Sequence, residues 1–167
     1  MGALSFGAAC GGVDNGTSES GNTSSFNSQT QSSSSQSASD DSSSNDEQEK
    51  QPSEGLEYTL SDDGTYYSVT DIGTCTDIDV IISSTYKNLP VKEIDEWAFA
   101  DCADLTKIII PDSVTSIGDG AFSYCSGLTS ITFKGTIAQW NAITKYGYWY
   151  YRVPAKKVVC SDGTVKL

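Results

Sequence analysis

The chain has 167 residues and no histidine, and 22 acidic against 10 basic side chains give it a formal net charge of -12. Without histidine, the usual Ser-His-Asp and Cys-His nucleophiles and all histidine-ligated metal sites are excluded, so we expect no catalytic residue, metal site or cofactor. A pair of carboxylates can still catalyse hydrolysis, but no two acids are marked for that role. The acidity, with no basic stripe, disfavours nucleic acid and anionic membrane surfaces as partners.

Residues 1–10 have the composition of the end of a secretory signal peptide. Small and apolar residues at 3–9 lead directly into Cys10. Small residues before a cysteine resemble the lipobox of bacterial lipoproteins, in which the signal peptide is cut before the cysteine and the cysteine is lipidated. The resemblance covers residues 7–10, with Gly7 in place of the usual leucine. It implies lipidation of Cys10 in a longer precursor. The alternative is a disordered N-terminus with an incidental cysteine.

Residues 11–54 are rich in Ser, Asn, Gln, Thr, Asp and Glu, with Phe26 the only large apolar side chain after residue 13. Ordering a backbone costs about 1–2 kcal/mol per residue, and this segment has too little apolar surface to offset that cost. We predict a disordered acidic linker of about 40 residues, with an average reach of about 35 Å. The folded domain is expected at residues 55–167.

The first predicted element of the domain is a β-hairpin. Residues 56–60 and 65–69 alternate between apolar and polar side chains, and the turn sequence Ser61-Asp62-Asp63-Gly64 separates them. A stack of repeats needs an irregular end unit, which this hairpin supplies. Residues 78–93 follow as an irregular first repeat, with a strand predicted at 80–82.

A repeat with a period of 23 residues relates 94–110 to 117–133. Its short strand ends at Pro111, which has no amide hydrogen to donate, and a single helical turn at 121–125 follows. Gly127 is predicted to leave that turn in a left-handed conformation, with Asp104 in the equivalent place. Spacing of this kind is the signature of leucine-rich repeats. The apolar pairs in phase are Ile94/Ile117, Ala98/Ala121, Phe99/Phe122, Cys102/Cys125, Leu105/Leu128, Ile108/Ile131 and Ile110/Phe133.

Residues 136–143 predict a short helix at the C-terminal end. Thr136 and Gln139 have capping-box spacing, and Ile137, Trp140 and Ile143 form an apolar stripe. We interpret Trp140 as a core residue and not as a ligand site. A last strand is predicted at residues 157–160, with a turn at 162–163 after it.

Three segments resemble the BspA-like leucine-rich-repeat family: residues 110–131 (IPDSVTSIGDGAFSYCSGLTSI), 135–143 (GTIAQWNAI) and 159–164 (VCSDGT). The resemblance extends over essentially all of 56–167. It implies a mainly β leucine-rich-repeat solenoid with short helical turns, here of about three coils, with the hairpin and the helix and strand as caps. It also implies a non-enzymatic bacterial protein on the extracellular side of the cell envelope. Some such proteins are linked to adhesion and host-protein binding.

The predicted domain contains four cysteines: Cys75, Cys102, Cys125 and Cys160. No two of them have CxxC spacing, so the evidence for a metal site is weak. Cys102 and Cys125 fall at the same place on neighbouring coils, within reach of a disulfide. The alternative, which we favour, is two buried thiols that pack as small apolar groups.

Two surfaces are candidates for binding. The outward strand positions form a candidate protein-binding face, although they can also be read as ordinary solvated positions. The aromatic run at 146–152 offers a platform for sugar rings, or a loop that wraps the last coil. The partner is thus a protein or glycan on a host or neighbouring cell; a structural envelope protein is the remaining alternative. The face comprises Asp79, Ile81, Lys107, Ile109, Ser130 and Thr132, and the platform Tyr148, Trp149 and Tyr150.

Overall fold

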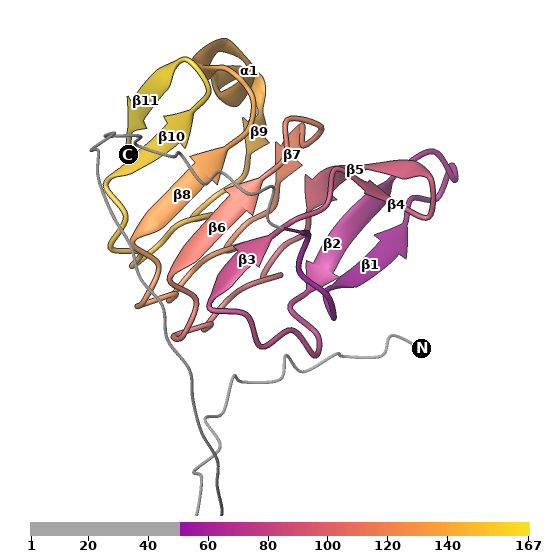
Figure 1. Cartoon of the computed structure of the whole chain (residues 1–167), viewed down its shortest axis with the longest axis horizontal. Helices are drawn as coiled ribbons and strands as arrows, with labels where there is room; N and C mark the ends of the chain where they lie inside the picture. Colours follow the sequence, from indigo (N-terminus) through magenta and orange to yellow (C-terminus); the bar gives the residue numbers. More distant parts are fainter. Residues whose placement is uncertain (1–50) are drawn as a thin grey trace, which may run out of the picture. The chain divides into compact units, whose positions relative to one another are not determined.

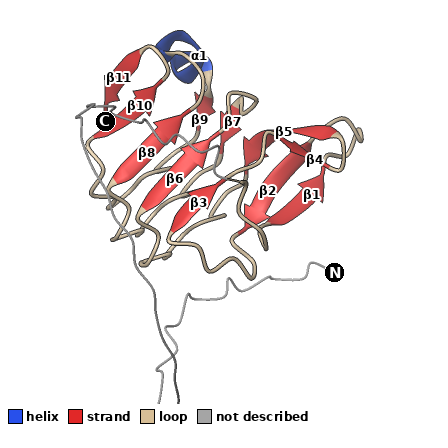
Figure 2. Cartoon of the chain, in the orientation of Figure 1, coloured by secondary structure: helices blue, strands red, loops and turns tan. Residues whose placement is uncertain are grey.

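A computed structural model describes residues 51–167 of the chain. The predictions for residues 1–50, lipidation of Cys10 included, lie outside the described residues. The described part is a β-solenoid of about four turns with two mainly parallel β-sheets and a single short helix (Figures 1 and 2). Its elements are β1 (Glu57–Leu60), β2 (Tyr67–Asp71), β3 (Asp79–Ile81), β4 (Thr85–Tyr86), β5 (Leu89–Ile94), β6 (Lys107–Ile110), β7 (Ser116–Ile117), β8 (Ser130–Phe133), α1 (Ile137–Ala142), β9 (Thr144–Lys145), β10 (Lys157–Cys160) and β11 (Gly163–Lys166).

The first sheet has the order β3-β6-β8-β10-β11. Strands β3, β6, β8 and β10 are parallel, and β11 returns antiparallel to β10. Val80, Ile108, Ile131 and Val158 are aligned by the register, and all four are fully buried. This ladder is the inner face of the sheet, because side chains alternate between the two faces of a strand.

The second sheet has the order β1-β2-β5-β7-β9, and β4 pairs with β5 beside this path. Strands β2, β5, β7 and β9 are parallel, and β1 is antiparallel to β2. The predicted N-terminal hairpin is therefore confirmed. Tyr58 from this hairpin stacks on Tyr86 with ring centroids 4.2 Å apart, which helps to hold the cap on the first turn.

The third side of the solenoid is a stack of irregular turns that follow β5, β7 and β9, and we call it the turn face. Successive turns are joined by backbone bonds: the Phe99 amide donates to the Ala121 carbonyl, and the Phe122 amide to the Trp149 carbonyl, both at 2.8 Å. Ala121 and Trp149 are thus equivalent, although 28 residues separate them and the preceding step is 23. The five extra residues lie between β8 and β9, where α1 is inserted.

Aromatic rings fill the core between the two sheets and the turn face. Phe99 and Phe122 stack with centroids 5.4 Å apart, and Trp140 lies 5.5 Å from Phe133. Trp140 is buried, as predicted. Cys125 is a buried thiol whose sulfur donates to the Phe99 carbonyl at 2.8 Å, which agrees with the thiol interpretation of this position.

Gly127 differs from its prediction, because neither it nor Asp104 has a positive φ. A Cβ at Gly127 would instead overlap the carbonyl oxygen of Ala103 on the preceding turn. This glycine is required for close packing between turns. The left-handed residues of the turn face lie elsewhere: Trp97, Asp101, Gly120, Tyr124, Gly147 and Arg152.

Both ends of the stack carry specific polar contacts. The capping box of α1 is present as predicted: Thr136 Oγ1 accepts from the Gln139 amide, and the Gln139 side chain accepts from the Thr136 amide. At the other end, the Ser53 amide donates to the Ile81 carbonyl and Ser53 Oγ accepts from the Ile81 amide. Ordered contacts therefore begin two residues before the predicted boundary, and they protect the exposed edge of β3.

Candidate functional site

The outer face of the first sheet, which we call the strand face, contains all six residues predicted there. The register aligns them in two rows, Asp79-Lys107-Ser130 and Ile81-Ile109-Thr132. Ile81 is only 8% exposed, however, because residues at the start of the domain cover the edge of β3. Five of the six predicted positions are therefore available on this face.

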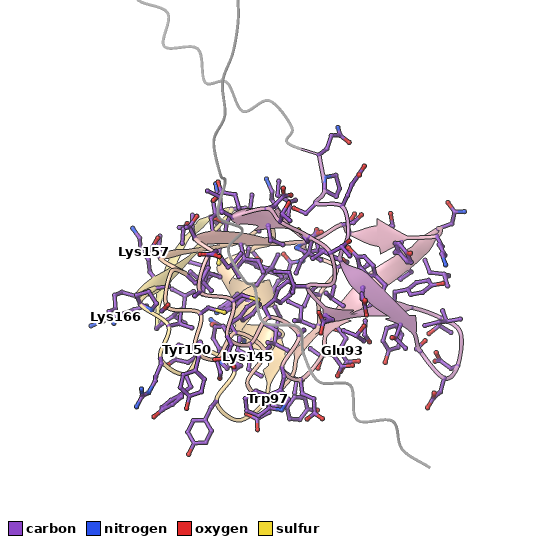
Figure 3. The ribbon with its side chains drawn as sticks, turned by 90° about the horizontal axis from the view of Figure 1, so that it is seen from below. Glu93, Trp97, Lys145, Tyr150, Lys157 and Lys166 are labelled. Atoms are coloured by element: carbon purple, nitrogen blue, oxygen red, sulfur yellow. The ribbon has the colours of Figure 1, made fainter. Side chains whose placement is uncertain are left out.

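Strands β10 and β11 extend both rows, which the sequence reasoning missed. The pairing of β10 with β8 places Lys157 beside Ser130 and Val159 beside Thr132. On the other side, Lys157 lies directly opposite Lys166, and Val159 opposite Thr164. Both lysines are exposed at the same edge of the molecule (Figure 3). The alternation of polar and apolar side chains at residues 157–160 could have indicated this extension. It was not used, because these residues are not in register with the 23-residue repeat.

A second surface gathers exposed aromatic side chains on the turn face. Tyr148 is 72% exposed, Trp97 is 54% exposed, and Tyr124 and Tyr151 are each 44% exposed. The Arg152 guanidinium lies 5.5 Å from the Tyr124 ring centroid and 5.6 Å from that of Tyr151. We call these five residues the turn patch. Figure 3 shows Trp97 and Tyr150 on this side of the domain, with neighbouring rings that project away from the ribbon.

Three members of the turn patch have a left-handed backbone, which is rare for bulky residues. Their φ angles are 61° at Trp97, 63° at Tyr124 and 59° at Arg152. Backbone pairing makes Tyr124 equivalent to Asp101, and Trp97 equivalent to Gly120 with φ of 61°. The turn itself imposes this conformation, since a glycine and an aspartate adopt it at the same places.

The contacts of the patch fix its side chains. The Trp97 ring lies against Gly120, where an added Cβ would overlap the indole. The Tyr148 amide donates to Asp119 Oδ1 at 2.7 Å. Tyr151 contacts both Tyr124 and Tyr148 edge-on, with ring planes at 82° and 66°. The exposed rings are therefore held in place but do not share a plane.

The predicted aromatic platform is wrong at Trp149. This residue is 5% exposed and packs against Phe122, Trp140 and Tyr150. It occupies the buried position that Ala121 occupies one turn earlier. Tyr148 is 72% exposed, and Tyr150 is 36% exposed with its ring centroid 4.5 Å from that of Trp149.

Among the ionisable side chains in residues 51–167, Lys145 and Tyr66 have shifted pKa values with a clear structural cause. No group of three His, Cys, Asp or Glu side chains is placed to hold a metal there. Burial lowers the pKa of Lys145, and its ammonium donates to the Trp140 and Ile143 carbonyls at the end of α1. The charge of Glu93 raises the pKa of Tyr66, whose hydroxyl lies 3.4 Å from Glu93 Oε2. Lys145 thus supports a helix end, and Tyr66 and Glu93 link neighbouring strands.

Comparison with known families identifies this fold. A family model described as "BspA type Leucine rich repeat region (6 copies)" matches residues 68–147, about half of the chain. Residues 68–147 belong to the BspA-type leucine-rich-repeat family. Leucine-rich-repeat proteins typically mediate protein interactions and are typically non-catalytic. In the described part of this BspA-type chain, no helix is both long and apolar enough to cross a membrane.

Solved structures of leucine-rich-repeat proteins are similar to this BspA-type chain. A leucine-rich repeat protein of T. pallidum is similar, with 23% identity and a TM-score of 0.51 over 66% of this chain and 49% of that one. The chain thus spans about half of that protein, and at this identity the likeness shows the fold alone. A leucine-rich repeat protein from Bacteroides capillosus ATCC 29799 has 20% identity and a TM-score of 0.47 over 64% and 94% of the two chains. A leucine rich cell surface protein from Faecalibacterium prausnitzii A2-165 has 23% identity and a TM-score of 0.47 over 64% and 30%. No curated protein matches the chain.

Proposed function

We propose that this protein is a non-catalytic adhesion module on the extracellular side of the bacterial envelope, and that it binds a protein partner through the turn patch. The observation that carries the proposal is the backbone under that patch. Trp97, Tyr124 and Arg152 are bulky, exposed and left-handed, in a turn that accepts glycine at the same place as Trp97. A left-handed conformation costs about 1–2 kcal/mol for a residue with a Cβ.

Bulky side chains at positions where a glycine and an aspartate adopt the same backbone conformation favour a functional reason for these residues. Backbone strain in folded proteins concentrates at functional sites. Trp, Tyr and Arg are also the residue types that dominate the binding energy of protein interfaces. The patch thus combines the composition of an interface with a conformational cost that folding alone does not require.

The uneven shape of the turn patch favours a protein over a sugar as its partner. A sugar ring stacks best on a flat aromatic surface, whereas the rings of Tyr124 and Tyr148 both meet Tyr151 edge-on. Burial of Trp149 removes the only indole from the platform that the sequence predicted at residues 148–150. An uneven patch of fixed rings around one guanidinium suits the complementary surface of a folded protein.

The test is a binding screen of the purified full chain against host extracellular-matrix proteins, followed by Trp97→Gly/Tyr124→Gly. Glycine removes both side chains and also the left-handed cost, so the fold should be retained. We expect at least a 30-fold loss of affinity, which corresponds to about 2 kcal/mol for lost interface anchors. The matched control is Ile109→Gly/Thr132→Gly on the strand face. Binding that survives the first variant and is lost in the control would contradict the proposal.

Attachment to the membrane is a separate part of the proposal. A lipid on Cys10, followed by the acidic linker predicted at 11–54, would hold the domain away from the membrane. Labelling of the full-length gene product with radioactive palmitate should give a signal in the wild type and none in Cys10→Ala. Label that survives in Cys10→Ala would contradict lipidation at this cysteine and leave the turn patch untouched.

A further inference from the structure

Charge is strongly segregated along the solenoid despite the overall acidity. Residues 51–119 contain fourteen acidic side chains and three lysines, whereas residues 120–167 contain a single acid, Asp162, and six basic side chains. The C-terminal end of the domain is therefore locally positive in a protein whose total charge is -12. The six bases are Lys134, Lys145, Arg152, Lys156, Lys157 and Lys166.

Two of these bases already have internal partners. Lys145 donates to carbonyls at the end of α1, and Arg152 lies over two tyrosine rings. The single acid is also engaged, because Asp162 Oδ1 accepts from the Ile137 amide at 2.7 Å. Lys157 and Lys166, by contrast, project from the strand face into solvent (Figure 3).

The register places Lys157 and Lys166 directly opposite each other on antiparallel strands. Like charges at such positions destabilise a sheet, because the side chains leave the same face about 5 Å apart. The same row continues through Ser130 to Lys107. The only carboxylate in it is Asp79, on the far strand β3.

The row crosses several strands and is flanked by hydroxyl groups. It crosses β6, β8, β10 and β11, which are three strand spacings or about 14 Å. The neighbouring row contributes Thr132, Val159 and Thr164 beside the lysines. This surface combines repeated positive charge with hydrogen-bonding hydroxyl groups and the exposed apolar side chain of Val159.

We propose that this part of the strand face binds an anionic polysaccharide whose chain runs across β11, β10, β8 and β6. Lysine ammonium groups meet the repeated acidic groups of the polymer, and Thr132 and Thr164 hydrogen-bond to its ring hydroxyls. A polymer fits better than a small anion, since the charges are spread along a row instead of converging on one point. A polysaccharide fits better than an acidic peptide, because the basic residues of the row are all lysines and offer no arginine fork for paired carboxylates.

The site is distinct from the turn patch and goes beyond protein binding. It lies on the first sheet, whereas the patch lies on the turns that follow the strands of the second sheet. Each surface can therefore be changed without the other, and failure of one proposal leaves the other standing.

The test measures binding of the full chain to polygalacturonate and to heparin, with neutral dextran as the uncharged control, by isothermal titration calorimetry at low salt. Lys157→Gln/Lys166→Gln should weaken binding at least tenfold, and 1 M NaCl should abolish it in the wild type. Comparison of the two polymers shows whether carboxylate or sulfate groups are preferred. Removal of two opposed like charges should leave the fold intact or stabilise it, which the thermal midpoint checks.

Lys87→Gln/Lys92→Gln is the matched control, because it removes the same charge outside the first sheet. Equal weakening in both double variants, or no binding of either polymer at low salt, would overturn the proposal. Polyglutamate that binds as tightly as the polysaccharides would overturn the choice of ligand. Thr132→Ala/Thr164→Ala should weaken polysaccharide binding without any effect on polyglutamate, and the reverse result would also count against a sugar.

Discussion

Trp149 and Tyr148 are neighbours in the sequence for which the structure predicts opposite effects on stability. Trp149 is 5% exposed, and its ring centroid lies 6.2 Å from that of Phe122 and 5.7 Å from that of Trp140. Truncation of a buried tryptophan removes these contacts and leaves a cavity, which costs about 3–5 kcal/mol. Tyr148 is 72% exposed, so Tyr148→Ala should change stability by less than about 0.5 kcal/mol.

Urea unfolding followed by far-ultraviolet circular dichroism measures both variants. Fluorescence is unsuitable, because Trp149→Ala removes one of only three indoles in the chain. With an m-value of about 2 kcal/mol per molar urea, the midpoint of Trp149→Ala should fall by about 1.5–2.5 M. The backbone bond from Phe122 to residue 149 remains possible in the variant. Equal midpoints for the two variants would refute the assignment of residues 146–153 as a third copy of the turn.

Three further changes test single features of the domain. Thr136→Ala removes the capping box and should cost about 1 kcal/mol, measured as a lower thermal midpoint. Gly120→Ala should cost more than about 1 kcal/mol and shift the indole emission of Trp97, because alanine resists the left-handed backbone and its methyl group would displace the ring. A hydrogen bond from Ser61 holds the pKa of Asp63 below its ordinary value, so this carboxylate stabilises the fold above about pH 4 and its contribution is lost on acidification. Asp63→Asn should therefore flatten the loss of stability between pH 5 and pH 3.

The solenoid could be predicted from the sequence because one step of the repeat is strict. Pairs such as Phe99 with Phe122 recur at 23 residues, and their burial follows directly from that spacing. The next step could not be predicted in the same way, because α1 adds five residues between β8 and β9. Residues 146–152 are therefore out of register with the 23-residue repeat, and the sequence predicts a loop there. Backbone hydrogen bonds show that they form a third turn.

Two members of the turn patch, Trp97 and Tyr124, were missed for a different reason. The 23-residue repeat aligns Trp97 with Gly120, but the sequence does not reveal that the backbone is left-handed at both positions. A hydrophobic residue in a repeat is ordinarily assigned to the core, since burial is its commonest role. Only the positive φ shows that these side chains point outward at a conformational cost.

The row of lysines on the strand face, Lys107, Lys157 and Lys166, could not be predicted either, because the sequence does not show which residues become neighbours in the sheet. A net charge describes the whole chain, whereas an interface responds to charges within about 10 Å. Lys157 and Lys166 are nine residues apart in the sequence and become direct neighbours through the turn between β10 and β11. The alternation of β10 was predicted, but its partner strand was not, and the pairing of the two lysines depends on both.

Two local rules of stability are thus broken on two different faces of the same small domain. On the turn face, Trp97 and Tyr124 occupy left-handed positions that glycine would fill at lower cost. On the strand face, Lys157 and Lys166 are opposed where one acidic residue would relieve the repulsion. Elsewhere the caps, the core ladders and the capping box all agree with the fold, as expected for a sequence consistent at every level. These unfavourable positions are all exposed, in a domain that otherwise follows the rules of its fold. A bound partner can supply the stabilisation that is missing at such positions.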